Sequence, residues 1–350
     1  MDIYAYIKKF KDYTFDEKEF NEVDNVILSS IMYLDFTRIV QNGYVGISLH
    51  DAGKIYLETY KRFDIYTKGV AQKTAFITLE HVVDTKRYKD IILSNYRYIT
   101  SLDTQFSALT FTISKNLKYI GFEGTDELIS GWKEDAFFSF KFPVDAQKYA
   151  IAYINEVVKL RDKKIILGGH SKGGNLALVA GMYANPLIKP KIKRIISNDG
   201  PGLRKEEFYS HKYKSIKKKF MHIIPSHSLV GILLYNDDYI VVKTNKKNIL
   251  AHDLATWLVE DDHFIKSPRD KESIIIEEKL NEYISSLSYK DQEKVVKSIF
   301  RELEKEGLIT VTDLLKFRKI LNVVKNLKNI DSKSKSILIE ILEIIINNYM

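Results

Sequence analysis

Residues 163–184 read KKIILGGHSKGGNLALVAGMYA, and this stretch decides the fold class of the chain. The apolar run 163–169 is typical of a short strand buried in a parallel sheet. The run 175–184 that follows predicts a buried helix. Between them, Gly169-His170-Ser171-Lys172-Gly173 matches the pattern G-x-S-x-G. This strand–turn–helix setting indicates a nucleophile elbow, in which a serine sits on a sharp turn above the edge of a sheet.

The chemistry of an elbow explains the residue types at these positions. Ser171 must expose its hydroxyl on a strained turn, and small residues at 169 and 173 let neighbouring backbones approach. The helix that begins there directs its free N–H groups toward a developing oxyanion, with the N–H of Lys172 as one donor. A glycine-rich turn that binds phosphate is the alternative. However, neither G-x-x-x-x-G-K-[ST] nor G-x-G-x-x-G occurs here.

Strand and helix patterns alternate on both sides of this segment. The β-rich runs 106–114 and 117–122 are separated by Lys115-Asn116, which predicts a hairpin turn. Helical spacing of apolar residues over 143–160 predicts a helix. Further strands are expected at 192–198, 220–225 and 239–244. Such alternation predicts an α/β fold with a mostly parallel sheet flanked by helices.

Shifts in composition divide the chain into three parts. Residues 1–100 are expected to form a mainly helical lead-in packed on the core; they include a helix at 21–36 capped by Asn21 or Asp24. Residues 101–268 form the predicted α/β-hydrolase core. Residues 269–350 are expected to form a C-terminal helical bundle, with helical patterns at 293–307, 311–327 and 335–350. Gly307 is suited to end the first of these helices.

Composition excludes several classes of function. The chain has 350 residues and no cysteine, so a disulfide scaffold, a thiolate nucleophile and a cysteine-ligated metal are all excluded. The net charge of +8 is too diffuse to indicate nucleic-acid binding. The first 20 residues lack the apolar segment of a secretory signal, and no stretch approaches 18 uncharged apolar residues. We therefore expect a cytoplasmic protein.

A serine hydroxyl needs a general base near neutral pH, so a histidine must lie near Ser171. In this fold the chain order is serine, acid, histidine, which excludes the two histidines at 50 and 81. His170 lies within the elbow and is interpreted as a packing residue. His252 follows the strand at 239–244 and a short loop, and it is the favoured base, ahead of His227 and then His263.

The acid that orients this imidazole is sought between Ser171 and His252. Asp199 ends the strand at 192–198 and precedes Gly200-Pro201-Gly202, so its carboxylate is expected at the ligand-binding edge of the sheet. Capping of this turn is the structural alternative for Asp199. Upstream, Thr125 follows another strand and is expected to supply the second oxyanion donor through its N–H, its hydroxyl being a further candidate.

With these residues placed, the chain resembles the Mbeg-like bacterial proteins, an α/β-hydrolase family akin to class 3 lipases. The likeness covers residues 18–260 and rests on ordered motifs: FNEVDNVILSSIMYLDF, YIGFEGTDELISGWKEDA, GGHSKGGNLA, SNDGPGL, PSHSLVGILL and HDLATW. It implies Ser171 as the nucleophile, His252 as the base and Thr125 at the oxyanion site.

Two positions depart from the pattern of class 3 lipases. Glu123 stands where those enzymes usually have arginine, and residues 225–228, Pro-Ser-His-Ser, contain no carboxylate where those enzymes have the acid. Asp199 is then the substitute acid of the triad. The departures also keep open a second reading, in which the hydrolase fold is retained without turnover and the C-terminal helices bind a partner.

The first hypothesis is therefore a serine esterase or lipase that forms an acyl-enzyme and needs no metal or organic cofactor. Its expected partner is an ester or lipid-like small molecule, not a nucleic acid. Five lysines between 212 and 219 are compatible with transient contact between the mouth of the site and an anionic membrane surface. A solvated loop is the alternative for this lysine segment. The oligomeric state is not predicted.

Overall fold

The computed structural model describes residues 1–41, 43, 45–101, 104–126, 129–308, 317–327, 332, 335–336 and 339–340. Its main feature is an eight-stranded sheet whose strand order follows the sequence. The strands are β1 (Ile47–Ser48), β2 (Ile92–Thr100), β3 (Gln105–Ser114), β4 (Leu117–Phe122), β5 (Lys164–His170), β6 (Ile192–Asn198), β7 (Phe220–Pro225) and β8 (Ile240–Val242). A separate pair is formed by β9 (Val259–Glu260) and β10 (His263–Phe264).

Strand direction divides the sheet in two. Strands β1 to β4 pair in antiparallel fashion, and β3 and β4 form the hairpin expected around Lys115-Asn116. Strands β4 to β8 are parallel to one another. The predicted α/β fold with a mostly parallel sheet is confirmed. Because parallel strands end at the same edge, the loops after β4, β5, β6 and β7 meet there.

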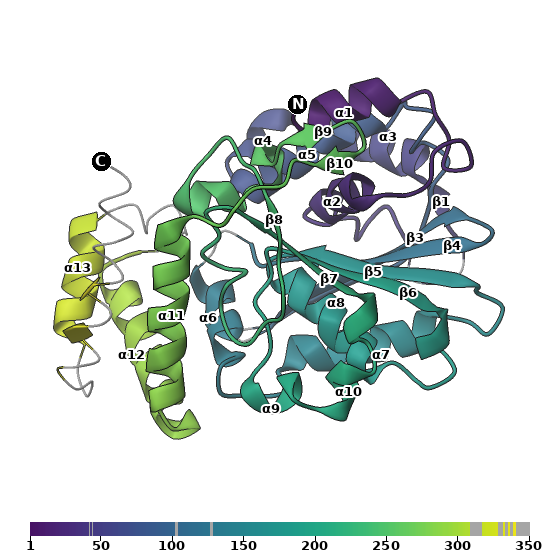
Figure 1. Cartoon of the computed structure of the whole chain (residues 1–350). Coiled ribbons are helices and arrows are strands. Elements are labelled where there is room, and N and C mark those ends of the chain that lie inside the picture. The colour runs from purple at the N-terminus through teal and green to yellow at the C-terminus, as the bar shows by residue number, and fades with distance from the viewer. Residues whose placement is uncertain are drawn as a thin grey trace.

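Helices cover both faces of the sheet, as Figure 1 shows. One face carries the N-terminal helices α1 (Ile3–Phe10), α2 (Glu22–Ile31), α3 (Leu49–Thr59), α4 (Arg62–Tyr66) and α5 (Val70–Val82). The other face carries α7 (Asp145–Val157) and α8 (Lys172–Tyr183). In β5, Ile166 belongs to the hydrophobic core on the face covered by the N-terminal helices. Ile165 and Leu167 belong to the core on the face covered by α7 and α8. This alternation explains the continuous apolar run of β5.

The remaining helices lie on loops or after the sheet. They are α6 (Ile129–Phe137), α9 (Lys205–Phe208), α10 (His211–Lys214), α11 (Lys271–Ser286), α12 (Tyr289–Lys305) and α13 (Phe317–Asn326). Short 3₁₀ turns occur at η1 (Lys189–Lys191), η2 (Lys217–Lys219), η3 (Asn248–His252) and η4 (Leu254–Thr256). No helix among the described residues is both long and apolar enough to cross a membrane.

The N-terminal part contributes to the sheet as well as covering it. Residues 1–100 are mainly helical as expected, but β2 lies within them and pairs with β3 along its length. The sequence analysis did not predict this strand. Its alternation of polar and apolar residues is interrupted by an irregularity between Ser94 and Arg97, where Asn95 has a φ of +55°. A boundary at residue 100 would therefore separate two paired strands.

Helix α2 is held by a capping box. Asn21 is the N-cap and accepts hydrogen bonds from the N–H groups of Val23 and Asp24, while Asp24 accepts from the N–H of Asn21. The two candidate caps therefore act together. Asp24 also forms an ion pair of 2.6 Å with Arg87, and both side chains are fully buried. This contact fixes α2 to the segment that leads into β2.

The C-terminal part is helical where the structure describes it. Figure 1 shows α11, α12 and α13 grouped beside α6, at one end of the sheet. Helix α12 matches the pattern expected at 293–307, and Gly307 follows its end with a φ of +65°. Helix α13 lies within the expected stretch 311–327, of which residues 311–316 lie outside the described residues. The helix expected at 335–350 lies mostly outside them too.

Candidate active site

Ser171 occupies the turn between β5 and α8. Its backbone has a φ of +56° and a ψ of −131°, a conformation that is costly for a residue with a side chain. The close approach of neighbouring backbones requires the flanking glycines. A Cβ on Gly169 would lie 2.4 Å from the carbonyl carbon of Gly173, and one on Gly173 would lie 2.1 Å from the oxygen of Phe122. These contacts explain the G-x-S-x-G pattern in steric terms.

Asp199 lies in the turn after β6 and is completely buried. Three donors surround its carboxylate. Oδ1 accepts hydrogen bonds from the hydroxyl of Ser228 (2.5 Å) and the N–H of Gly231 (3.0 Å), and Oδ2 lies 2.7 Å from Nδ1 of His252. Ser228 belongs to the segment without a carboxylate noted above, so this segment contributes a hydroxyl that holds Asp199. The φ of Asp199 is +50°, a value that aspartate tolerates better than most residues.

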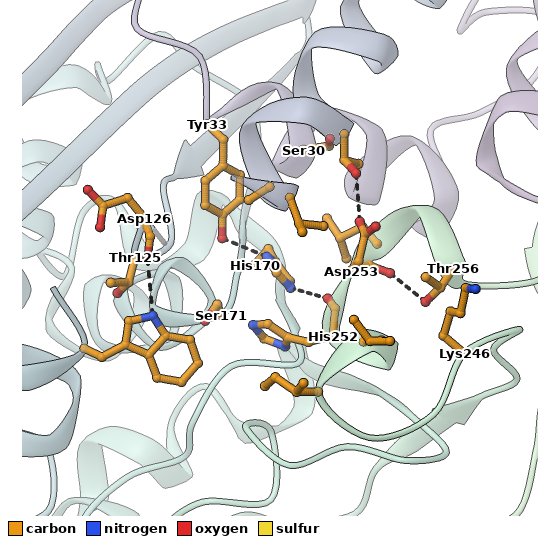
Figure 2. Close-up of a pocket in the computed structure, with 17 residues that line it drawn as sticks. Ser30, Tyr33, Thr125, Asp126, His170, Ser171, Lys246, His252, Asp253 and Thr256 are labelled. Atoms are coloured by element: carbon orange, nitrogen blue, oxygen red, sulfur yellow. Dashed lines mark hydrogen bonds between the residues drawn. The ribbon is translucent and has the colours of Figure 1, made fainter. Parts of the chain in front are cut away.

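His252 ends the 3₁₀ turn η3, and its side chain is 15% exposed. Because Nδ1 faces Asp199, the ring is oriented and Nε2 is left on the other side of the imidazole. His252 and Ser171 line the same cavity (Figure 2). The other two candidate bases lie elsewhere: His227 is beside Asp270 (3.4 Å) and His263 is beside Asp262 (3.3 Å), and neither lines this cavity.

His170 supports the loop that carries His252. Its Nε2 lies 2.9 Å from the carbonyl oxygen of His252, and its Nδ1 lies 2.8 Å from the hydroxyl of Tyr33 (Figure 2). Burial, with the nearby His252 adding to it, holds the pKa of His170 well below its usual value. The neutral ring therefore donates through Nε2 and accepts from Tyr33 at Nδ1. The sequence analysis assigned His170 to packing; no sequence pattern pointed to Tyr33.

Thr125 and Lys172 flank Ser171, but their side chains are engaged elsewhere. The Thr125 hydroxyl donates to Oδ2 of Asp135 at 2.5 Å. The Lys172 ammonium donates to Glu134 at 2.5 Å, and both side chains of this pair are buried. Each residue can therefore serve an oxyanion through its backbone N–H only. Lys172 is the first residue of α8, so its N–H has no acceptor within the helix.

Two buried carboxyl groups lie close to this network. Burial, together with Asp126 and Asp35, raises the pKa of Glu123 to about 8, although Lys172 opposes the shift. Burial likewise raises the pKa of Asp135 to about 6, against the influence of Lys172. The Lys172 ammonium thus lies among the carboxyl groups of Glu134, Asp135 and Glu123, next to the turn that carries Ser171. Its pairing with Glu134 also joins α8 to α6.

A cavity of about 170 Å³ opens above Ser171. Figure 2 shows Thr125, His170 and His252 around the serine, whereas the labelled polar residues Ser30, Lys246, Asp253 and Thr256 line the part of the cavity farther from it. Aliphatic side chains from two regions complete the wall: Val70 and Ala71 from α5, and Ile249, Leu250 and Leu254 from the loop around His252. Among the described residues, no three His, Asp or Glu side chains form a group that could hold a metal ion.

The lysine segment lies away from this cavity. Lys217–Lys219 form η2 directly before β7, so they lie at the amino end of a parallel strand. The cavity lies at the carboxyl end of β5, which is the opposite edge of the sheet. Lys217 pairs with Asp237 (2.8 Å), and Lys219 donates to the carbonyl of Lys189 (2.9 Å). Of the two interpretations of the lysine segment, this placement favours a solvated loop over a membrane contact at the mouth of the site.

Comparison with known proteins assigns the family. A model of the Mbeg1-like family matches residues 82–301, which is more than half of the chain. The chain belongs to the Mbeg1-like family. The predicted resemblance is confirmed, although the Mbeg1-like match begins later than expected and extends through α11 into α12. Asp199, His252 and the elbow all lie within it.

Among solved structures, this Mbeg1-like protein is similar to the crystal structure of M37 lipase. The two are 14% identical, the match covers 61% of this chain and 70% of that chain, and the TM-score is 0.38. A search of curated proteins finds no match.

Proposed function

We propose that the protein is a serine hydrolase that cleaves a carboxylic ester through Ser171, His252 and Asp199. The contact of 2.7 Å between Asp199 Oδ2 and His252 Nδ1 carries this proposal. A carboxylate in that position selects the tautomer with a free Nε2, which is the atom that must accept the serine proton. The positive φ of Ser171 supports its role, because strained backbone is typical of a nucleophile elbow.

The reaction follows from these roles. The Ser171 hydroxyl attacks the ester carbonyl carbon while Nε2 of His252 takes its proton, and the imidazolium that forms is stabilised by Asp199. The N–H groups of Lys172 and Thr125 are proposed to stabilise the oxyanion. Collapse of this intermediate breaks the ester bond, and the alcohol leaves with the proton from His252. Water, deprotonated by His252, then attacks the acyl-enzyme and releases the carboxylic acid and free Ser171.

The test is labelling by a fluorophosphonate probe, which reacts with an activated serine. The pure protein should be labelled, and Ser171→Ala should not. Ser30→Ala is the matched control, because Ser30 lines the same cavity, and this variant should still be labelled. Turnover of p-nitrophenyl esters of different acyl lengths would then establish ester hydrolysis. Equal labelling of wild type and Ser171→Ala would overturn the proposal.

A second candidate is a binding protein that retains the fold without turnover. The buried Glu123, at the position where class 3 lipases usually have arginine, favours this candidate. Absence of labelling, failure on every ester and a stable complex recovered with the full chain would together support it. The cytoplasmic location and the division at residues 100 and 268 stay predictions.

A further inference from the structure

A second cavity lies between the core and the C-terminal helices. Its volume is about 270 Å³. Its lining comes mainly from α6, the loop between β7 and β8, α11 and α12, with Pro201 from the loop after β6 in addition. The two C-terminal helices contribute Leu280, Ile284, Val295, Val296 and Ile299, and Leu287 lies in the short connection between them. We call this space the helical cavity. Figure 1 shows α11 and α12 beside α6, with the sheet on the other side of α6.

Most side chains that line the helical cavity are apolar, and Ser139, Tyr283 and Gln292 add uncharged polar atoms. On α12, Val295 and Val296 are three to four positions before Ile299, which puts them on one face of the helix. The loop adds Val230, Leu233 and Leu234. Among the described residues that line this cavity, Asp135 is the only charged one; its carboxylate accepts a hydrogen bond from the hydroxyl of Thr125 and lies near Lys172. The helical cavity therefore suits a hydrocarbon chain and offers no pairing for a charged ligand.

Trp132 links the helical cavity to the candidate active site, because its side chain lines both cavities. Its indole N–H donates to the carbonyl of Asp126 at 3.3 Å. The indole ring meets the His252 imidazole edge-on, with centroids 6.5 Å apart. The indole ring of Trp132 thus lies between the imidazole of His252, the proposed catalytic base, and the helical cavity.

We propose that the helical cavity binds the acyl chain of a long-chain ester, with Trp132 as the partition that the chain passes. This inference rests on the proposed function, because it takes the ester carbonyl to lie at Ser171. The position of Trp132 in the lining of both cavities and the mostly apolar wall support this occupant. Helices α11 and α12 are then part of substrate recognition, and they set the longest chain that fits.

A graded dependence on chain length follows. Each methylene that enters an apolar site from water should raise kcat/KM by about fourfold until the space is filled. Val296→Trp would fill the helical cavity, so the increase in kcat/KM should stop at a shorter acyl chain. Lys297→Trp is the matched control, because Lys297 is the next residue on α12 and is exposed. It should leave the chain-length profile unchanged.

Binding can be measured without turnover in Ser171→Ala. A diazirine analogue of palmitic acid, photolysed with this variant, should crosslink to peptides of α11 or α12, and unlabelled palmitic acid should compete. This measurement needs no substitution in the helical cavity, so it stands even where Val296→Trp fails to fold. Crosslinking without fluorophosphonate labelling of wild type would retain the acyl site and reject the hydrolase. Labelling of Ser171 without crosslinking to either helix would reject the acyl site alone.

Discussion

The imidazole of His170 lies against the imidazole of His252, with ring centroids 4.3 Å apart. The first ring also donates to the carbonyl oxygen of the residue that carries the second. The buried His170 thus holds the loop that carries His252 in place, through a ring contact and a hydrogen bond. Tyr33, which follows α2 on the opposite side of the sheet from α8, orients His170 in turn. The N-terminal part therefore supports the candidate site directly.

Replacing His170 tests this support. His170→Phe keeps a ring but removes both hydrogen bonds, so we expect kcat to fall by about 10²-fold through misplacement of His252. Tyr33→Phe removes only one hydroxyl and should cause a smaller loss. The measurements are kcat and KM on a p-nitrophenyl ester together with the rate of fluorophosphonate labelling. His81→Phe, a change at an exposed histidine on α5, is the control. Unchanged kcat in His170→Phe would exclude a positioning role.

Replacing Asp199 tests the proposed acid. Asp199→Asn retains a side chain that tolerates a φ of +50° but no longer selects the correct tautomer of His252. We expect kcat to fall by about 10³- to 10⁴-fold with KM little changed. Asp237→Asn is the control, because Asp237 pairs with Lys217 away from the cavity. A fully active Asp199→Asn would show that another group orients His252.

The buried pair of Lys172 and Glu134 predicts a non-additive effect on stability. Lys172→Met leaves the Glu134 carboxylate buried without its cation, and we expect a loss of about 3–5 kcal/mol in the free energy of unfolding. Lys172→Met combined with Glu134→Gln should recover part of this loss. Urea denaturation of Lys172→Met, Glu134→Gln and the double variant measures both effects. Losses that simply add would argue against a direct pairing.

The raised pKa of Glu123 predicts a pH-dependent difference in stability. Between about pH 4.5 and 8 the folded state binds a proton at Glu123 that the unfolded state has released. This stabilisation is complete below the pKa that Glu123 has in the unfolded chain, 4.5. It is lost as pH rises through the pKa of about 8 that Glu123 has in the folded protein. Glu123→Gln lacks this titration, so its free energy of unfolding relative to wild type should rise from pH 5 to pH 9. Denaturation at several pH values measures the change.

A control for this prediction is available at the surface. Glu58 on α3 is exposed, and Glu58→Gln makes the same chemical change without burial. The pH-dependent rise should be specific to Glu123→Gln. A constant difference between Glu123→Gln and wild type across this range would contradict the assigned pKa.

Elements with strong local signals were predicted well. The apolar run of β5, the two close-approach glycines around Ser171 and the helix that follows are consecutive in sequence, so local patterns were enough to predict them. Asp199 and its turn were found because parallel strands bring their carboxyl ends to one edge. Strand β2 was missed, because its irregular residues interrupt the alternation on which prediction depends.

The sequence by itself determined the fold class and the turn that carries Ser171, since each depends on residues that are close along the chain; it also supplied a short list of side chains proposed to act with Ser171. Only the tertiary structure decided which histidine meets Asp199, 53 residues away, and that His170, Tyr33 and Glu134 surround the site. It also decided that α11 and α12 enclose an apolar space beside Trp132. Such contacts depend on how distant segments pack together, and no local pattern of residues encodes that packing.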